Sequence, residues 1–378
     1  MLTVFKNGYV YHTDTRSFKK ENLFVRDGVI SEISTPDRVV DCDGKYIIPG
    51  LVDVHTHGRG GYDFNTASAE DVKKMRASYA KAGTTTVMAT LASATMESFE
   101  ESAEAINANR TVTKGLANIA GIHLEGRYLN PKRRGAHAEN LLAPLDAGEA
   151  KTLVEKMMPL PVHVSASLED EGAEDFTKTL VGMGVTVALA HSDATYDEAM
   201  TAVGWGATAF THTFNAMRPI HHREPGLAVA SMLSDGAYTE LICDGMHVHP
   251  AMIALCDRAK ADGGLVLITD SMEAAGCADG DYTIAGMPVI VKDGMAVTSD
   301  GALAGSTLDL FTALKNYMAF TGKTLENALP CATINPANEV GISNVCGSLD
   351  TGKNADFIIL NDKNDPVIES VWINGDKI

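Results

Sequence analysis

Two histidines stand one residue apart in the segment GLVDVHTHGRGG, residues 50–61. His55 and His57 follow the short apolar run 51–54, which is typical of a buried strand. If the strand continues through them, both imidazoles leave the same face, roughly 6 to 7 Å apart. That separation suits two ligands of one metal ion, and it equally suits a hydrogen-bonded histidine pair at a strand end. The rest of the chain must distinguish these two interpretations.

Metal-binding side chains also end four other predicted strands: Glu125, His191, His212 and Asp270. Together with the first pair, they supply four imidazoles and two carboxylates from five strands. This mixture suits one or two divalent ions of the zinc or iron type, because calcium and magnesium prefer shells of oxygen alone. Each residue alone has a structural explanation, but all of these explanations would have to hold at once. We therefore predict a metal site.

Asp270 has a possible role in catalysis as well. A carboxylate beside a metal-bound water can accept its proton and later return it to a leaving nitrogen. A divalent metal brings the pKa of bound water to about 7, so hydroxide becomes available at neutral pH. The set therefore predicts metal-dependent hydrolysis. His123 shares a strand face with Glu125 and is either a partner of a ligand or a core histidine, whereas His163 is predicted to be structural.

The elements that must position these residues alternate between short apolar runs and longer helical stretches. Eight such runs are present: 47–54, 84–90, 117–125, 161–167, 185–191, 207–213, 239–244 and 265–270. Eight strands with intervening helices are the number that closes an α/β (β/α)8 TIM barrel, whose active site lies at the carboxyl ends of its strands. The barrel thus brings the predicted ligands to one point.

Both ends of the chain have a different sequence pattern, which predicts short strands of alternating apolar and polar residues separated by turns such as KNG, RDG and CDG. We predict one small β-sandwich domain formed by residues 1–49 and 341–378, around a barrel that spans 50–340. The stretch 282–301, with its KDG turn, is predicted to form a β-hairpin after the eighth strand.

The composition excludes several classes of protein. The chain has 378 residues, 45% of them hydrophobic, and no apolar run reaches 18 residues, so we expect no membrane span. The net charge of −18 argues against binding to nucleic acid or anionic lipid. The six cysteines form no CxxC pair, and the amino terminus lacks a secretory signal pattern. These features fit a cytoplasmic enzyme with reduced thiols.

Seven motifs carry a resemblance to a known family: PGLVDVHTHG, GIHLEGRYLNP, RRGAH, LAHSDA, THTFNAMRPIHHREPG, CDGMHVHP and LITDSM. They resemble the N-acetylglucosamine-6-phosphate deacetylase family within the amidohydrolase superfamily. Many two-metal members of the superfamily bridge their ions with a carboxylated lysine at the end of strand four, but PVHVSASLE contains no lysine. Glu125 can supply the bridging carboxylate instead. The resemblance implies hydrolysis of N-acetyl-D-glucosamine 6-phosphate to glucosamine 6-phosphate and acetate.

The resemblance also implies roles for the metal ligands. Glu125, His191 and His212 would hold the catalytic metal, and His55 and His57 would hold a second ion joined through Glu125. Relatives with one metal replace the two latter histidines with amides, so two-metal capability is expected here. The donor set accepts zinc, iron, manganese or cobalt.

Further roles concern the substrate. By resemblance, Asp270 activates the water and protonates the departing amine, while His137 polarises the acetyl carbonyl. Asn215 and Ala216 match positions that contact the substrate. The family's phosphate-binding pair, contributed by the neighbouring subunit of a homodimer, is matched by Arg223 and His247.

Three departures from the family pattern leave the substrate open: Arg127, Thr213 and the fourth-strand end SLED, residues 167–170. One alternative is a deacetylase that prefers N-acetylgalactosamine 6-phosphate. Another is an amidohydrolase acting on a cyclic amide or a nucleobase. A nonenzymatic alternative is a barrel that has lost its metals and serves in assembly, against which the complete ligand set argues.

Overall fold

The computed structural model describes residues 1–32, 35–260, 263–299 and 301–378. Eight parallel strands form one sheet in sequence order. They are β6 (Leu51–Thr56), β7 (Thr84–Ala92), β8 (Asn118–Glu125), β9 (Val162–Ala166), β10 (Thr186–Leu189), β11 (Ala209–Phe210), β12 (Tyr238–Ile242) and β13 (Leu265–Ile268). A parallel bridge between Thr56 and Ser271 joins the first strand to the segment after the last. Each strand overlaps one of the predicted runs, and the predicted barrel is confirmed.

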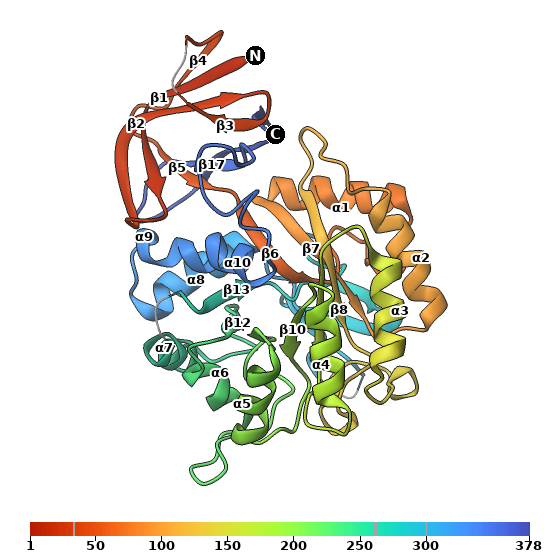
Figure 1. The fold of residues 1–378 in the computed structure, drawn as a ribbon. Helices are drawn as coiled ribbons and strands as arrows, with labels where there is room; N and C mark the ends of the chain where they lie inside the picture. The colour runs from red at the N-terminus through yellow and green to blue at the C-terminus, as the bar shows by residue number, and fades with distance from the viewer. Residues whose placement is uncertain (33–34, 261–262, 300) are drawn as a thin grey trace.

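Helices surround the barrel strands (Figure 1). They are α1 (Ala69–Lys81), α2 (Met96–Asn107), α3 (Ala147–Met157), α4 (Ala173–Gly182), α5 (Tyr196–Trp205), α6 (Gly226–Leu233), α7 (Pro250–Ala259), α8 (Leu310–Thr321), α9 (Leu325–Ala328) and α10 (Ile334–Glu339). Short 3-10 turns lie at Pro131–Arg133, Glu139–Leu141 and Leu329–Ala332. Both α1 and α5 begin with capping boxes, in which the cap side chain and the third helical residue satisfy each other's backbone N–H groups.

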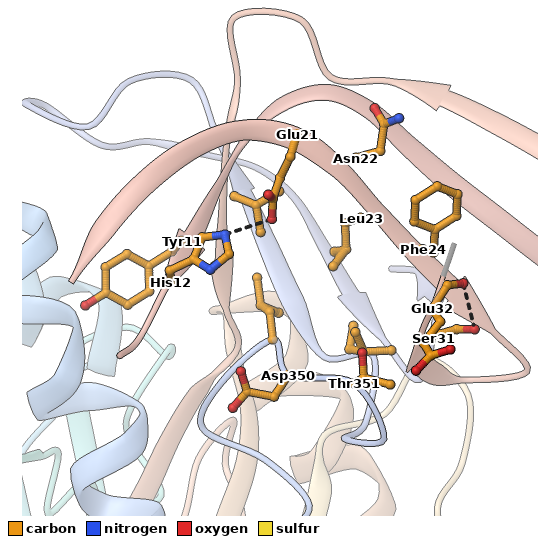
Figure 2. Close-up of a pocket in the computed structure, with 13 residues that line it drawn as sticks. Tyr11, His12, Glu21, Asn22, Leu23, Phe24, Ser31, Glu32, Asp350 and Thr351 are labelled. Carbon is orange, nitrogen blue, oxygen red and sulfur yellow. Dashed lines mark hydrogen bonds and ion pairs between the residues drawn. The ribbon is translucent and has the colours of Figure 1, made fainter. Parts of the chain in front are cut away.

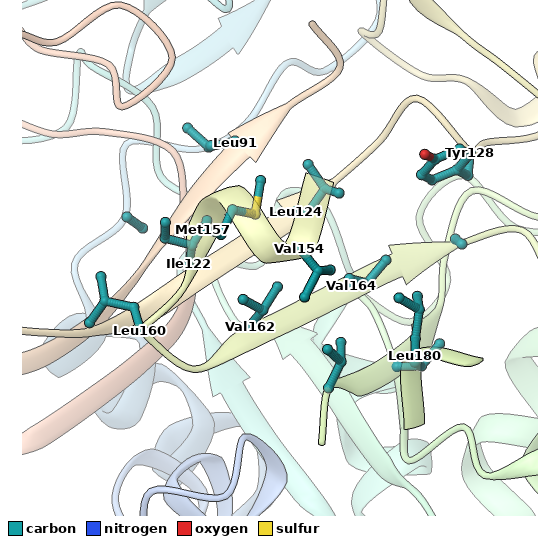
Figure 3. Close-up of a cluster of buried hydrophobic side chains, with 14 of the residues drawn as sticks. Leu91, Ile122, Leu124, Tyr128, Val154, Met157, Leu160, Val162, Val164 and Leu180 are labelled. Carbon is teal, nitrogen blue, oxygen red and sulfur yellow. The ribbon is translucent and has the colours of Figure 1, made fainter. Parts of the chain in front are cut away.

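The two faces of a barrel strand carry different chemistry. On β8, Ile122 and Leu124 belong to the apolar cluster between the strands and the helices, together with Val154 of α3 (Figure 3). His123 and Glu125, which alternate with them, point to the opposite face because side chains alternate along a strand. The helix-facing side therefore holds the barrel together, and the interior face is left for polar groups.

Both ends of the chain form one further sheet, as predicted. Its strands are β1 (Leu2–His12), β2 (Ser17–Arg26), β3 (Val29–Ser31), β4 (Arg38–Asp41), β5 (Tyr46–Pro49), β17 (Phe357–Leu360), β18 (Ile368–Ile373) and β19 (Asp376–Lys377). The C-terminal strand β17 pairs antiparallel with β5, which pairs parallel with β1. The sheet has its own core, in which the rings of Phe5, Phe357 and Trp372 pack against one another.

Gly50 links this terminal sheet to the barrel. A Cβ atom at this position would lie 2.1 Å from the Thr85 hydroxyl oxygen, so a larger residue does not fit without displacement. The Gly50 amide donates to the carbonyl of Asp356, whose buried carboxylate accepts from Asn118 of β8 at 2.8 Å. The two sheets are therefore joined by backbone and side-chain hydrogen bonds. The predicted limits of the barrel, residues 50 and 340, stay a prediction.

A small antiparallel sheet follows the last barrel strand. It consists of β14 (Gly280–Ile284), β15 (Met287–Lys292) and β16 (Met295–Val297). The predicted hairpin is present, and a third short strand extends it. All six cysteines are free, as expected, and five of them are buried. Within the described ranges, no helix has the length and apolarity needed to cross a membrane.

Candidate metal centre

Glu125 lies between two pairs of histidines at the carboxyl end of the barrel. Its Oε1 atom is 3.2 Å from His191 Nε2 and 2.9 Å from His212 Nε2. Its Oε2 atom is 3.5 Å from His55 Nε2 and 3.1 Å from His57 Nε2. The two carboxylate oxygens therefore face different pairs, which is the arrangement needed to bridge two ions.

The Nε2 atoms of the four histidine rings lie toward Glu125. His191 donates its Nδ1–H to the carbonyl of Arg133 at 2.8 Å, which leaves Nε2 unprotonated in the neutral ring. That Nε2 lies 3.1 Å from Nε2 of His212. Two ring nitrogens and a carboxylate oxygen thus converge on one point, and a divalent cation fits this donor set.

Asp270 completes the second group. Its Oδ1 atom is 3.4 Å from His55 Nε2 and 3.2 Å from His57 Nε2. Burial alone would lower the pKa of His57, but Asp270 and Glu125 outweigh it and raise this pKa to about 9. The two carboxylates thus make the site favourable for positive charge, which a divalent ion supplies.

The carboxylates themselves stay ionised. Burial opposes the charge of Asp270, but His55 and His57 overcome it and hold the pKa of Asp270 well below its usual range. The pKa of Glu125 is likewise held low, because His55 and the other surrounding histidines outweigh its burial. Both groups are therefore available as anionic ligands or as a base.

Three of the residues grouped around Glu125 have left-handed backbone conformations. The φ angles are 44° at His191, 31° at His212 and 48° at Asp270. Residues with a Cβ atom rarely adopt this region, and each such position costs of order 1–3 kcal/mol. The surrounding fold therefore supports local strain where these strands end and their side chains turn into the site.

A cavity of about 250 Å³ lies over these residues. It is lined by His57, Glu125, His137, His191, His212, Asn215, Ala216, His247 and Asp270, and by Ile284, Leu303 and Gly305 on the side of the small antiparallel sheet. Nearly all of the predicted site residues line this cavity or contact its lining.

A larger groove, of about 750 Å³, lies on the terminal sheet. Figure 2 shows its lining, which includes His12 paired with Glu21 at 2.7 Å. The groove is open, and its polar groups do not converge on one point. We therefore assign the functional site to the smaller barrel cavity, because convergent groups with shifted pKa values mark a site better than volume does.

His137 is fixed by Ser93, a residue that sequence reasoning missed. The Ser93 amide donates to His137 Nδ1 at 3.3 Å, and the Ser93 hydroxyl lies 2.9 Å from the same nitrogen. Because an amide can only donate, Nδ1 accepts and the proton of the neutral ring lies on Nε2. That Nε2 faces the site, 3.6 Å from Glu125 Oε2.

The two predicted phosphate ligands lie in different places. His247 is partly buried and lines the cavity, and the carboxylate of Asp244 accepts a hydrogen bond from its Nδ1 at 2.5 Å. Burial lowers the pKa of His247, but the Asp244 carboxylate outweighs it and raises this pKa. Arg223 is exposed in a loop, where it donates to His222 at 2.8 Å, and it does not line the cavity. The single chain therefore does not bring Arg223 to the site.

Sequence reasoning also missed Glu240. This buried carboxylate on β12 accepts from His55 Nδ1 at 3.3 Å and from the His212 amide at 3.2 Å. The signal was available, since an acid inside the apolar run TELI requires a buried partner. His123 contacts the His55 ring edge-on, but its hydrogen bonds go to Thr90 and Ser165 rather than to a ligand.

The sequence is similar to those of known deacetylases of N-acetylamino sugar phosphates. An N-acetylgalactosamine-6-phosphate deacetylase of Escherichia coli O157:H7 is 35% identical over 355 residues, which cover 93% of each chain. An N-acetylglucosamine-6-phosphate deacetylase of Vibrio furnissii is 34% identical and matches 87% of this chain and 82% of its own.

The fold is similar to solved structures over the whole chain. One is a mutant of the N-acetyl-D-glucosamine-6-phosphate deacetylase of Mycobacterium smegmatis in complex with N-acetyl-D-glucosamine 6-phosphate. It has 31% identity and a TM-score of 0.89, and the match covers 100% of this chain and 98% of that one. The enzyme of Pasteurella multocida has 27% identity and a TM-score of 0.92, with 100% coverage of both chains. Residues 46–378 match the profile of the amidohydrolase family. The chain therefore belongs to the amidohydrolase family.

Proposed function

We propose that the chain catalyses the metal-dependent hydrolysis of N-acetyl-D-glucosamine 6-phosphate to D-glucosamine 6-phosphate and acetate. The observation that carries the proposal is Glu125 between two histidine pairs, with Asp270 beside one of them. The similarity to deacetylases of N-acetylamino sugar phosphates, at 34–35% identity over most of the chain, supports the substrate class.

Five residues would hold the metal. Glu125, His191 and His212 would bind the catalytic ion, and His55 and His57 would bind a second ion with Glu125 shared. Zinc, iron, manganese and cobalt all accept imidazole and carboxylate ligands. When bound, such an ion supplies a lowered pKa for water and polarises a carbonyl.

Asp270 would move the proton, and His137 would polarise the acetyl carbonyl. Asp270 would take a proton from the attacking water and deliver it to the nitrogen of the departing amine. Its ionised state supports the first step. His137 would donate a hydrogen bond from Nε2 to the acetyl carbonyl oxygen, where negative charge develops. The contact between its Nδ1 and the Ser93 amide supports this tautomer.

The substrate would be bound at its other end by a second subunit. Asn215 and Ala216 would contact the sugar from within the chain. The cavity lining, as far as the described residues define it, includes no lysine or arginine. An arginine suits a phosphate well, which supports a homodimer in which Arg223 reaches the neighbouring active site, whereas His247 lines the cavity of its own chain and would bind the phosphate there.

N-acetylgalactosamine 6-phosphate is a second candidate substrate, because the relative that is 35% identical is named for it. The sequence departures do not favour either epimer. Arg127 pairs with Glu149 at 3.0 Å, Thr213 bonds to Ser231 at 2.9 Å, and Glu169 bonds to Ser192 at 2.8 Å. All three side chains are used within the protein and do not line the cavity.

The test is a comparison of acetate release from the two sugar phosphates, from unphosphorylated N-acetylglucosamine and from a cyclic amide. We expect both phosphates to react after reconstitution with zinc or iron, and the other two compounds to react poorly. Removal of metal with a chelator should abolish the activity. Faster hydrolysis of the cyclic amide would contradict the proposal.

The six free cysteines support action in the cytoplasm, where thiols stay reduced.

A further inference from the structure

Glu240 contacts one ligand from each of the two histidine pairs. Its side chain is fully buried on β12. One of its oxygens, Oε2, lies 3.3 Å from Nδ1 of His55 and 3.2 Å from the backbone amide of His212. A single carboxylate oxygen therefore accepts from a side chain in one pair and from the backbone in the other.

Glu240 also lies near two further buried groups, Glu339 of α10 and His163 of β9. The possible ligand atoms of these three residues lie within 4.8 Å of one another, and each residue is at most 2% exposed. Two ionised carboxylates in contact would repel each other strongly at this depth. Burial and the neighbouring Glu240 raise the pKa of Glu339 well above its usual range, which favours the protonated form that donates a hydrogen bond to Glu240.

His163 does not supply a positive charge. Its Nδ1 atom lies 2.8 Å from the Thr186 hydroxyl, and burial lowers the pKa of His163 to about 4. One proton on Glu339 is therefore sufficient to balance this cluster. A divalent cation bound by the three residues is the competing explanation for the same donor set.

We propose that Glu240 is a positioning residue that fixes His55 and His212 relative to each other, and that Glu339 holds Glu240 in place from the opposite side. This inference rests on the proposed metal-dependent function, because its effect is exerted through two metal ligands. By accepting from Nδ1, Glu240 sets the tautomer in which His55 Nε2 is free to bind a metal. Such outer partners of ligands typically contribute 10- to 100-fold to metal affinity or activity, as an order of magnitude.

The experiment compares zinc affinity in purified variants by competition with a chromophoric chelator. Glu240→Ala removes both hydrogen bonds and should weaken zinc binding by about 10- to 100-fold. Glu240→Gln keeps one accepting oxygen and should show a smaller loss. Glu339→Gln keeps a neutral donor toward Glu240 and should bind zinc as tightly as the wild type. Asp356→Asn changes a buried carboxylate far from the site and serves as the matched control.

Several outcomes would overturn the proposal. Unchanged zinc affinity in Glu240→Ala, or an equal loss in Asp356→Asn, would show that Glu240 does not position the ligands. A third zinc ion per wild-type chain that disappears in Glu339→Gln would make the buried cluster a metal site instead. If Glu240→Ala does not fold, Glu240→Gln decides the question. Wild-type zinc affinity in Glu240→Gln, with an unaltered dependence of that affinity on pH, would contradict the proposal. Zinc affinity is measured without substrate, so failure of the deacetylase proposal would be seen separately, in the acetate assay.

Discussion

The two histidine pairs beside Glu125 are held in different ways. His191 and His212 come from separate strands, and both have left-handed backbone conformations. The Nδ1 proton of His191 goes to a backbone carbonyl, that of Arg133. This pair is therefore held chiefly through its main chain and through backbone contacts, which include the contact of the His212 amide with Glu240.

The other pair depends on side chains. His55 and His57 lie on the single strand β6, with ring centroids 5.3 Å apart. Their nitrogens face carboxylates, since Glu240 lies at Nδ1 of His55 and Asp270 lies near Nε2 of both rings. The difference teaches that the first pair is the more robust half of the centre, and that the second pair is more easily altered by substitution.

The largest effect is expected where the two halves meet. Glu125→Gln keeps the size of the side chain but removes the charge shared by both pairs. We expect kcat/KM to fall by about 10³-fold or more, because metal binding supplies several kcal/mol of transition-state stabilisation. Zinc content should fall below one ion per chain. A variant that kept two ions would show that the halves are independent of Glu125.

Asp270→Asn tests the chemistry of the side-chain half. It keeps the shape and loses the base, so kcat should fall by roughly 10² to 10⁴, the range of general acid–base catalysis. Metal content should change little. Near wild-type turnover in steady-state assays would rule out Asp270 as the group that moves the proton.

Replacing both His55 and His57 with Asn should remove one half and leave the other. We expect the metal content to fall from two ions to one, since the pair on β6 is lost while His191 and His212 remain. The fall in kcat should be about 10-fold, or about 1.4 kcal/mol, and thus smaller than that for Asp270→Asn. The comparison requires elemental analysis under excess metal. A wild-type protein that holds only one ion would refute the two-metal assignment.

Arg223→Ala should leave both halves of the centre intact. Loss of a charge-assisted hydrogen bond should raise KM for the 6-phosphate by about 10- to 100-fold without changing metal content. The unphosphorylated sugar should be unaffected.

The arrangement across subunits has its own test. Mixing inactive Asp270→Asn chains with Arg223→Ala chains should restore partial activity, because one site of the heterodimer then has both residues. No recovery, with subunit exchange demonstrated, would place Arg223 in its own active site.

The smallest effect concerns pH. Asp244 raises the pKa of His247 above its ordinary value near 6.5, so His247 stays charged, and useful to a phosphate, until the pH rises through the raised value. KM for the phosphorylated substrate should therefore increase at high pH. In Asp244→Asn the pKa of His247 falls and the increase in KM should begin at lower pH, by a few-fold at neutrality. Identical pH profiles would exclude this pair from phosphate binding.

The fold and most of the metal centre could be predicted from the sequence, because both follow from the alternation of side chains along strands. His55, Glu125, His191, His212 and Asp270 all end apolar runs, and a barrel brings such ends together. Their common location could therefore be predicted without coordinates.

Other features left no such signal. Ser93 acts partly through its backbone amide, which every residue except proline provides. Glu240 contacts two ligands that are distant in sequence, so its place in the apolar run TELI marks it as a buried acid but does not identify its partners. The proposed role of Arg223 requires a second subunit, and single-chain periodicity does not contain that information.

The most direct test of the account is a crystal structure of the zinc- or iron-loaded protein with glucosamine 6-phosphate, with the ions located by anomalous scattering. We predict two ions on opposite sides of Glu125, one with His191 and His212 and one with His55 and His57. The product amine should lie within hydrogen-bonding distance of Asp270, and the phosphate should meet Arg223 of a second subunit. A product bound with its amine remote from Asp270, or metal bound away from Glu125, would contradict the central claim.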